Sequence, residues 1–189
     1  MLKWATIGRG PVLTLPRLNR ALARVVRELD SHGLWDEALA AIEVYLAPFS
    51  VTAYGWQMYS STGEIRMPAV CLGRLRDFFR GDYMSVADVL RHEYGHALAD
   101  THRGLFRSRQ FSTAFGASHE CPDEFEYDPE CHVSPYSAKD TSEDFAEVFM
   151  LYLRRSGRLP SRHATPAIVA KWRFVQNLCR AVRARKRRW

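Results

Sequence analysis

The chain has 189 residues, of which 47% are apolar and 25% are charged. This balance excludes an intrinsically disordered chain, and the length fits one domain spanning residues 1–189. No apolar run approaches the roughly 18–20 residues that cross a bilayer, so we expect no contact with a membrane. The net charge of +6 resides in a C-terminal tail, residues 180–189, which carries six basic residues and no acidic one.

The first part of the chain predicts two helices and then a β-hairpin. Residues 17–30 place apolar side chains at three- and four-residue spacing, and residues 35–47 predict a second helix that the following proline ends. The runs 51–59 and 64–71 are rich in β-branched and aromatic residues and flank a Ser-Ser-Thr-Gly turn, which predicts a hairpin. Pro68 indicates that the second run lies at a sheet edge.

The second part of the chain is mainly helical. Ser85 is expected to cap the first of its helices, and Thr141 or Ser142 a later one. Residues 117–137 contain three prolines and several acids with little periodicity, which indicates a loop. The fold class is therefore α+β, with a small sheet before the first of these helices. The helices are predicted over residues 85–100, 105–116, 141–155 and 167–185.

A metal-binding motif lies in the helix predicted over residues 85–100. His92 and His96 stand four residues apart, so both imidazoles share one helical face and can bind one zinc ion. Glu93 is one step round the helix, where its carboxylate can accept a proton from a water that zinc has activated. Gly95 costs about 1 kcal/mol inside a helix, which indicates that another segment packs closely there.

A catalytic zinc ion needs a third protein ligand, and two candidates compete. His102 completes a spacing that resembles the metzincin pattern, but Ala99 stands where metzincins have a glycine. Glu143 begins the run Glu143-Asp144-Phe145-Ala146-Glu147, which resembles the second ligand helix of gluzincins. We favour Glu143 and keep His102 as the alternative ligand.

The resemblance to gluzincins extends to the anthrax lethal-factor-like branch of that family. In that branch a tyrosine lies between the His-Glu-x-x-His run and the later Glu-x-x-Ala-Glu run, as Tyr136 does in this chain. The resemblance implies a zincin-like fold, zinc bound by His92, His96 and Glu143, and Glu93 as general base. It also implies that Tyr136 donates a hydrogen bond to the oxyanion. Glu147, one helical turn after Glu143, would orient a ligating histidine.

These observations predict a metallopeptidase that uses one zinc ion and hydrolyses a peptide or protein substrate. We expect an endopeptidase rather than an exopeptidase. The resemblance further implies that the hairpin lines the cleft and pairs with the substrate backbone. Tyr54, Trp56 and Tyr59 would then lie beside the substrate.

Several alternatives remain open at this point. The zinc could be structural, in a zincin-like binding module without activity. His119, Cys121, Cys131 and His132 could hold a second zinc ion, or they could belong to a loop with free cysteines. The acids of that loop could border the cleft and favour a basic substrate, or the loop could simply be solvated, which we take as the default.

The C-terminal tail and the expected compartment leave further alternatives. Residues 180–189 could contact a polyanion such as a nucleic acid, or they could form the solvated end of a helix. The N-terminus lacks the uninterrupted apolar stretch of a signal peptide, and four scattered cysteines do not form a disulfide framework. We therefore expect a cytoplasmic protein, with export by a signal-independent route left open.

Overall fold

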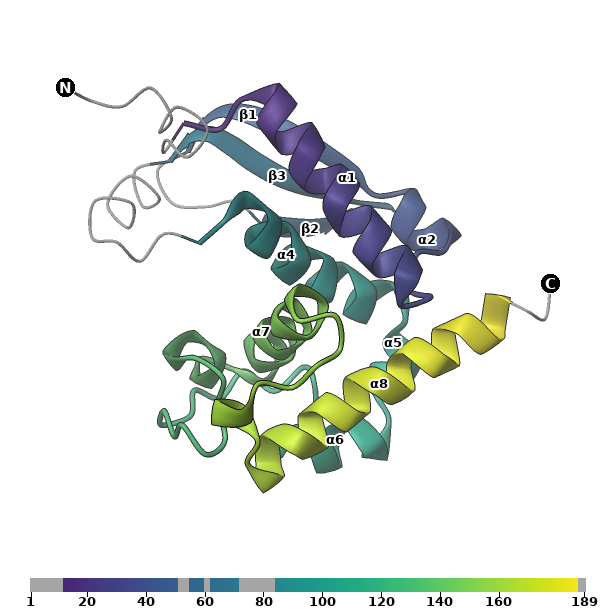
Figure 1. Ribbon diagram of the computed structural model, residues 1–189, viewed down its shortest axis with the longest axis vertical. Helices are drawn as coiled ribbons and strands as arrows, with labels where there is room; N and C mark the ends of the chain where they lie inside the picture. The colour runs from purple at the N-terminus through teal and green to yellow at the C-terminus, as the bar shows by residue number, and fades with distance from the viewer. Residues whose placement is uncertain (1–11, 51–54, 60–61, 72–83, 187–189) are drawn as a thin grey trace.

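A computed structural model describes residues 12–50, 55–59, 62–71 and 84–186. None of the helices in these ranges is both long and apolar enough to cross a membrane. Figure 1 shows α1 and the sheet on one side of α4, and α7 and α8 on the other. The elements in chain order are α1 (Leu15–Ser31), α2 (Glu37–Ala40), β1 (Glu43–Ser50), β2 (Gly55–Tyr59), β3 (Thr62–Cys71), α4 (Val86–Thr101), α5 (Arg103–Phe106), α6 (Arg109–Phe115), the 3-10 helix η2 (Pro135–Ala138), α7 (Thr141–Arg154), the 3-10 helix η3 (Ser161–His163) and α8 (Pro166–Lys186).

The sheet has three strands in the order β1-β3-β2. The predicted hairpin is confirmed, because β2 pairs antiparallel with the first half of β3. The prediction that Pro68 marks an edge strand is wrong, because β3 is the central strand and pairs parallel with β1 on its other side. The described part of β2 pairs only with residues 62–66, so Pro68 lies beyond it.

The helix predicted over residues 35–47 is wrong in its second half. A single turn of helix, α2, ends at Ala40, and the chain then enters β1. Ile42, Val44 and Tyr45 favour a strand, and pairing with β3 outweighs the local helical pattern. Pro48 therefore lies within β1, which is an edge strand and tolerates a residue without an N–H.

The core is built around α4, which contacts α1, β2 and α7. One stripe of α4 is apolar, with Leu90, Tyr94 and Leu98 almost fully buried. The α+β class and the small sheet ahead of α4 are as the sequence predicts. Because α4 is buried on both sides, its position is fixed by the sheet and by α7 together.

Helix caps set where the two central helices begin. The Ser85 hydroxyl accepts from the backbone N–H of Asp88 at 3.1 Å, as expected of the cap of α4. The cap of α7 is Asp140 rather than Thr141 or Ser142, since its Oδ1 accepts from the Glu143 N–H at 2.8 Å. This contact fixes the backbone of Glu143 in the first turn of α7.

The C-terminal segment is part of α8 as far as residue 186. Val182 is 1% exposed, and Arg183 donates a hydrogen bond to the carbonyl of Ser31 at the end of α1. The basic tail therefore continues α8 as far as residue 186, and Val182 and Arg183 contact the domain. Residues 187–189 lie outside the described part of the chain.

Candidate metal centre

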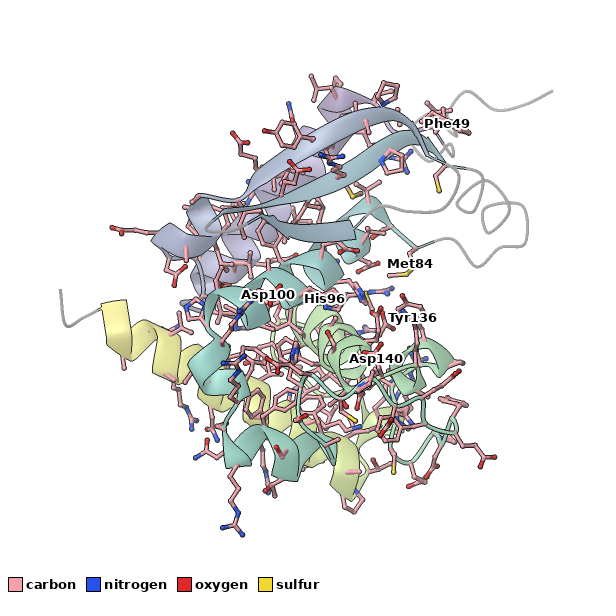
Figure 2. The ribbon with its side chains drawn as sticks, turned by 180° about the vertical axis from the view of Figure 1, so that it is seen from behind. Phe49, Met84, His96, Asp100, Tyr136 and Asp140 are labelled. Carbon is pink, nitrogen blue, oxygen red and sulfur yellow. The ribbon has the colours of Figure 1, made fainter. Side chains whose placement is uncertain are left out.

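The side chains of the predicted site come from two helices that face each other. His92 and His96 lie on α4, and Glu143 lies in the first turn of α7. Figure 2 shows His96, Tyr136 and Asp140 at the junction of these elements. The helices approach closely because α4 has a glycine at the crossing: a Cβ on Gly95 would lie 3.2 Å from the Cα of Ala146. The close packing expected at Gly95 is confirmed.

Three ligand atoms form a nearly equilateral triangle. Nε2 of His92 lies 3.1 Å from Nε2 of His96 and 3.0 Å from Oε2 of Glu143, and the third side measures 3.3 Å. Ligands about 2.0–2.1 Å from a tetrahedral zinc ion are separated by about 3.3–3.4 Å. The triangle therefore fits zinc after a small expansion, and the residue types are ones that zinc accepts.

Hydrogen bonds on the outer side of both histidines leave Nε2 for a metal. Nδ1 of His92 lies 3.0 Å from Oε1 of Glu147, and Nδ1 of His96 lies 3.1 Å from Oγ of Ser142. A carboxylate only accepts, so Nδ1 of His92 carries a proton, and the serine oxygen can accept from His96 in the same way. Each ring can then present an unprotonated Nε2 to an ion.

Glu143 divides its two oxygens between two tasks. Oε2 faces the histidines, whereas Oε1 accepts from the Tyr136 hydroxyl at 2.9 Å and from Nζ of Lys139 at 3.0 Å. Burial alone would raise the pKa of Glu143, but its bonds to His92 and His96 lower that pKa far below its ordinary value. The carboxylate is ionised, as a metal ligand must be.

The same negative charge affects the groups around it. Burial disfavours a charged imidazole, but hydrogen bonds to Glu143 and Glu147 outweigh it and raise the pKa of His92 to about 10. Burial raises the pKa of Tyr136 above its ordinary value, and the nearby Glu143 carboxylate raises it further. The centre therefore attracts positive charge, whether a proton or a metal ion, and Tyr136 remains a neutral donor.

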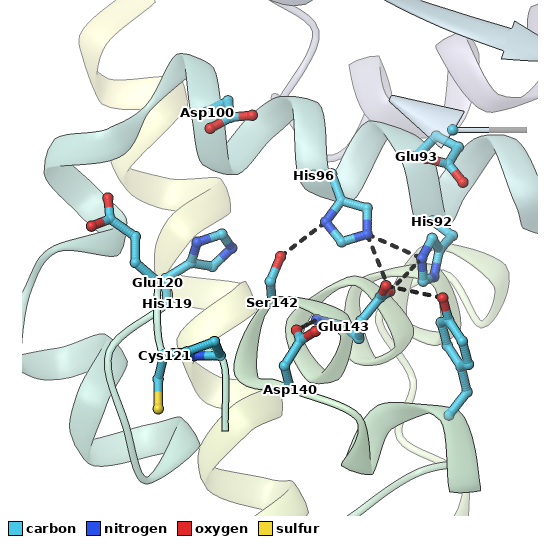
Figure 3. A pocket seen from close by; sticks show the side chains of 13 residues that line it. His92, Glu93, His96, Asp100, His119, Glu120, Cys121, Asp140, Ser142 and Glu143 are labelled. Carbon is cyan, nitrogen blue, oxygen red and sulfur yellow. Dashed lines mark hydrogen bonds and ion pairs between the residues drawn. The ribbon is translucent and has the colours of Figure 1, made fainter. Parts of the chain in front are cut away.

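The triangle opens onto a cleft of about 540 Å³. Glu93 is 5% exposed and lines this cleft beside the histidines, with Gly55 of β2 close to its carboxylate. Figure 3 shows Glu93 on α4, one residue past His92, and the loop at His119 and Glu120 at the opposite end. The acidic loop thus borders the cleft at residues 119–122, one of the two alternatives for it.

His102 is not part of the group. Its Nε2 lies 2.9 Å from Oδ2 of Asp36, the cap of α2, and its Nδ1 lies 2.9 Å from Oγ1 of Thr101. Both ring nitrogens therefore have partners away from the triangle. His102 joins the end of α4 to α2, which explains why it is only 7% exposed.

The proposed second zinc site does not form among the described residues, where the group able to hold a metal is His92, His96 and Glu143. His119 packs edge-on against Phe106 and Phe111, while Nδ1 of His132 accepts from the backbone N–H of Asp128. Cys121 and Cys131 are free. The free-cysteine alternative agrees with the structure. Tyr54 and the side chains of Trp56 and Tyr59 lie outside the part of the chain that the structure describes, so their expected place in the cleft stays a prediction.

Three residues that contact the site belong to neither of the two sequence motifs. Ser142 contacts His96, Lys139 contacts Glu143, and Ser134 contacts Glu147. Lys139 and Ser142 stand within four residues of Glu143 at the start of its predicted helix, which is the only signal the sequence offers for them. Ser134 carries no such signal, because its contact spans a loop.

No known family model matches the chain, and no curated protein or solved structure matches it. The resemblance to gluzincins therefore remains one of motifs. His92, His96 and Glu143 form a largely buried group that could hold one metal ion.

Proposed function

We propose that the protein is a zinc-dependent peptidase of zincin-like fold that hydrolyses a peptide or protein substrate. The observation that carries the proposal is the triangle of two imidazole nitrogens and one carboxylate oxygen, at the spacing of zinc ligands, beside Glu93 in an open cleft. Three protein ligands leave a fourth position for substrate or water, as catalytic rather than structural zinc sites do.

Each residue has a role that follows from its place. His92, His96 and Glu143 hold the ion, and Glu147 keeps His92 in the required tautomer. Zinc, when bound, lowers the pKa of water to about 7 and polarises a carbonyl. Glu93 accepts the proton of the attacking water and passes it to the leaving amine. Tyr136, half exposed at the edge of the cleft, donates its hydroxyl hydrogen to the oxyanion.

Glu93→Gln separates catalysis from metal binding. The amide keeps the size of the side chain but cannot accept a proton, so we expect a wild-type zinc content and a loss of about 10²–10⁴-fold in kcat. The assay uses a library of peptides blocked at both ends, since an endopeptidase cleaves them and an exopeptidase does not. Full activity in Glu93→Gln would contradict the proposal. Zinc binding without cleavage by the wild type would favour a non-catalytic module.

A further inference from the structure

Ser134 lies where two parts of the proposed site meet. Its hydroxyl donates to Oε2 of Glu147 at 2.7 Å, and the other oxygen of Glu147 is bonded to Nδ1 of His92. A line of hydrogen bonds therefore runs from Ser134 through Glu147 to the metal-facing imidazole. Glu147 is only 6% exposed, so few waters can replace the serine if it is removed.

The same serine begins the short helix that carries Tyr136. Ser134 is the N-cap of η2, where its Oγ accepts from the Ser137 N–H at 3.2 Å. Ser137 completes the cap from the other side, because its Oγ accepts from the Ser134 N–H at 3.3 Å and donates to the Ser134 carbonyl at 2.7 Å. The Ser134 hydroxyl thus donates to Glu147 and accepts from η2 at the same time.

We propose that Ser134 is a positioning residue that fixes the Glu147 carboxylate against His92 and holds the helix of Tyr136 in register with it. This inference rests on the proposed function: its first part needs only the proposed zinc site, whereas its second part also needs the peptidase activity. The line Ser134–Glu147–His92 restricts the imidazole to one orientation and one tautomer. Removal of such an outer partner typically costs 10–100-fold in metal affinity or activity.

The test measures zinc affinity by chelator competition, in the full chain, for a set of single variants. Ser134→Ala is expected to bind zinc about 10–100-fold more weakly. Ser134→Thr is expected to restore the affinity to within about twofold, because threonine keeps the hydroxyl, caps helices and suits the extended backbone of this residue. Circular dichroism and thermal melting establish that each variant is folded.

Ser137→Ala is the matched control for the cap. It removes the reciprocal half of the cap, whose described hydrogen bonds go to Ser134 and not to Glu147, so zinc affinity should stay within about twofold while peptidase activity falls through Tyr136. Zinc affinity reduced equally in Ser137→Ala and Ser134→Ala would overturn the inference, since loosening of the loop would then explain both.

A double-mutant cycle tests whether Ser134 acts through Glu147. In a Glu147→Ala background, Ser134→Ala should have almost no further effect on zinc affinity. A folded Ser134→Ala variant with wild-type zinc affinity, or additive losses in the cycle, would overturn the inference and leave the proposed peptidase untouched. If the variants show the predicted zinc affinities but the wild type cleaves no peptide, the role of Ser134 toward His92 is upheld and the peptidase proposal is overturned. A wild-type chain that binds no zinc would overturn both.

Discussion

At the residue scale, the two oxygens of Glu143 face different groups, so that in the proposed mechanism one carboxylate serves both the metal ion and the substrate. Oε2 completes the ligand triangle, whereas Oε1 holds Tyr136 and Lys139. Tyr136 is therefore kept beside the cleft by the same side chain that could hold the ion. Its hydroxyl can exchange this bond for one to an oxyanion without leaving the site.

Tyr136→Phe tests that role. The variant should keep zinc, because the tyrosine is not a ligand, and should lose about 10²–10³-fold in kcat with little change in KM. The pKa of Tyr136 is raised above the ordinary tyrosine value of 10.0, so the wild-type phenol is still neutral at pH 10.0. Its ionisation should therefore not limit activity below that pH. Steady-state kinetics across pH measure both effects; unchanged kcat in the variant would remove Tyr136 from the mechanism.

The part of the site that the sequence reveals is the part with fixed spacing. His92, Glu93 and His96 are defined by helical geometry alone, and the choice of Glu143 came from a motif on another helix. Ser134 could not be found in this way, because its hydrogen bond to Glu147 joins two elements 13 residues apart and depends on tertiary structure. The same reason explains why His102, equally plausible by spacing, turns out to bind Asp36.

At the scale of elements, the periodic spacing of apolar residues predicted the long helices correctly. It failed where pairing with a strand distant in the sequence determines the secondary structure. The helices around residues 17–30, 85–100, 141–155 and 167–185 are present because their buried stripes match their partners. Residues 43–47 looked helical, but they form a strand because β3 lies beside them, with Glu43 paired to Glu64 further along the chain. Val44 and Tyr45 favour a strand only weakly, and the parallel pairing that decides the structure cannot be read from local spacing.

The crossing of α4 and α7 depends on Gly95. Gly95→Ala should lower the free energy of unfolding by about 1 kcal/mol, since overpacking costs about 1–3 kcal/mol and alanine regains about 1 kcal/mol of helix propensity. Zinc affinity should fall as well, because the added methyl group pushes Ala146 and the ligand helix away.

Gly104→Ala is the matched control, since no heavy atom lies within 4 Å of a Cβ at that position. Urea denaturation of both variants measures the difference. A Gly95→Ala variant as stable as Gly104→Ala would contradict the prediction, because α7 would then move away from the added methyl group with no loss of stability.

At the scale of the whole molecule, a partly buried ion pair joins α1 to α4, the helix that carries His92 and His96. Arg91 of α4 is 1% exposed and donates to both oxygens of Glu28 on α1, at 2.7 and 2.8 Å. Burial alone would raise the pKa of Glu28, but these bonds outweigh it and lower the pKa below its ordinary value of 4.5. Asp88 also pairs with Arg91 and lies in the first turn of α4.

The pair predicts a loss of stability in acid. A lowered folded-state pKa contributes stability that is complete above pH 4.5 and is lost as the pH falls through the folded-state value. Glu28→Gln should therefore destabilise the protein by about 2 kcal/mol at pH 7, and the difference from wild type should shrink below pH 4.5. Urea unfolding at several pH values measures this; a constant difference would contradict the assignment.

The central claim is that His92, His96 and Glu143 hold one zinc ion, and the zinc content of purified protein tests it most directly. Elemental analysis after dialysis should give about one zinc per chain for the wild type and for His102→Ala, and little for Glu143→Ala. Folded wild-type protein without zinc would contradict the claim. Zinc retained in Glu143→Ala but lost in His102→Ala would do the same.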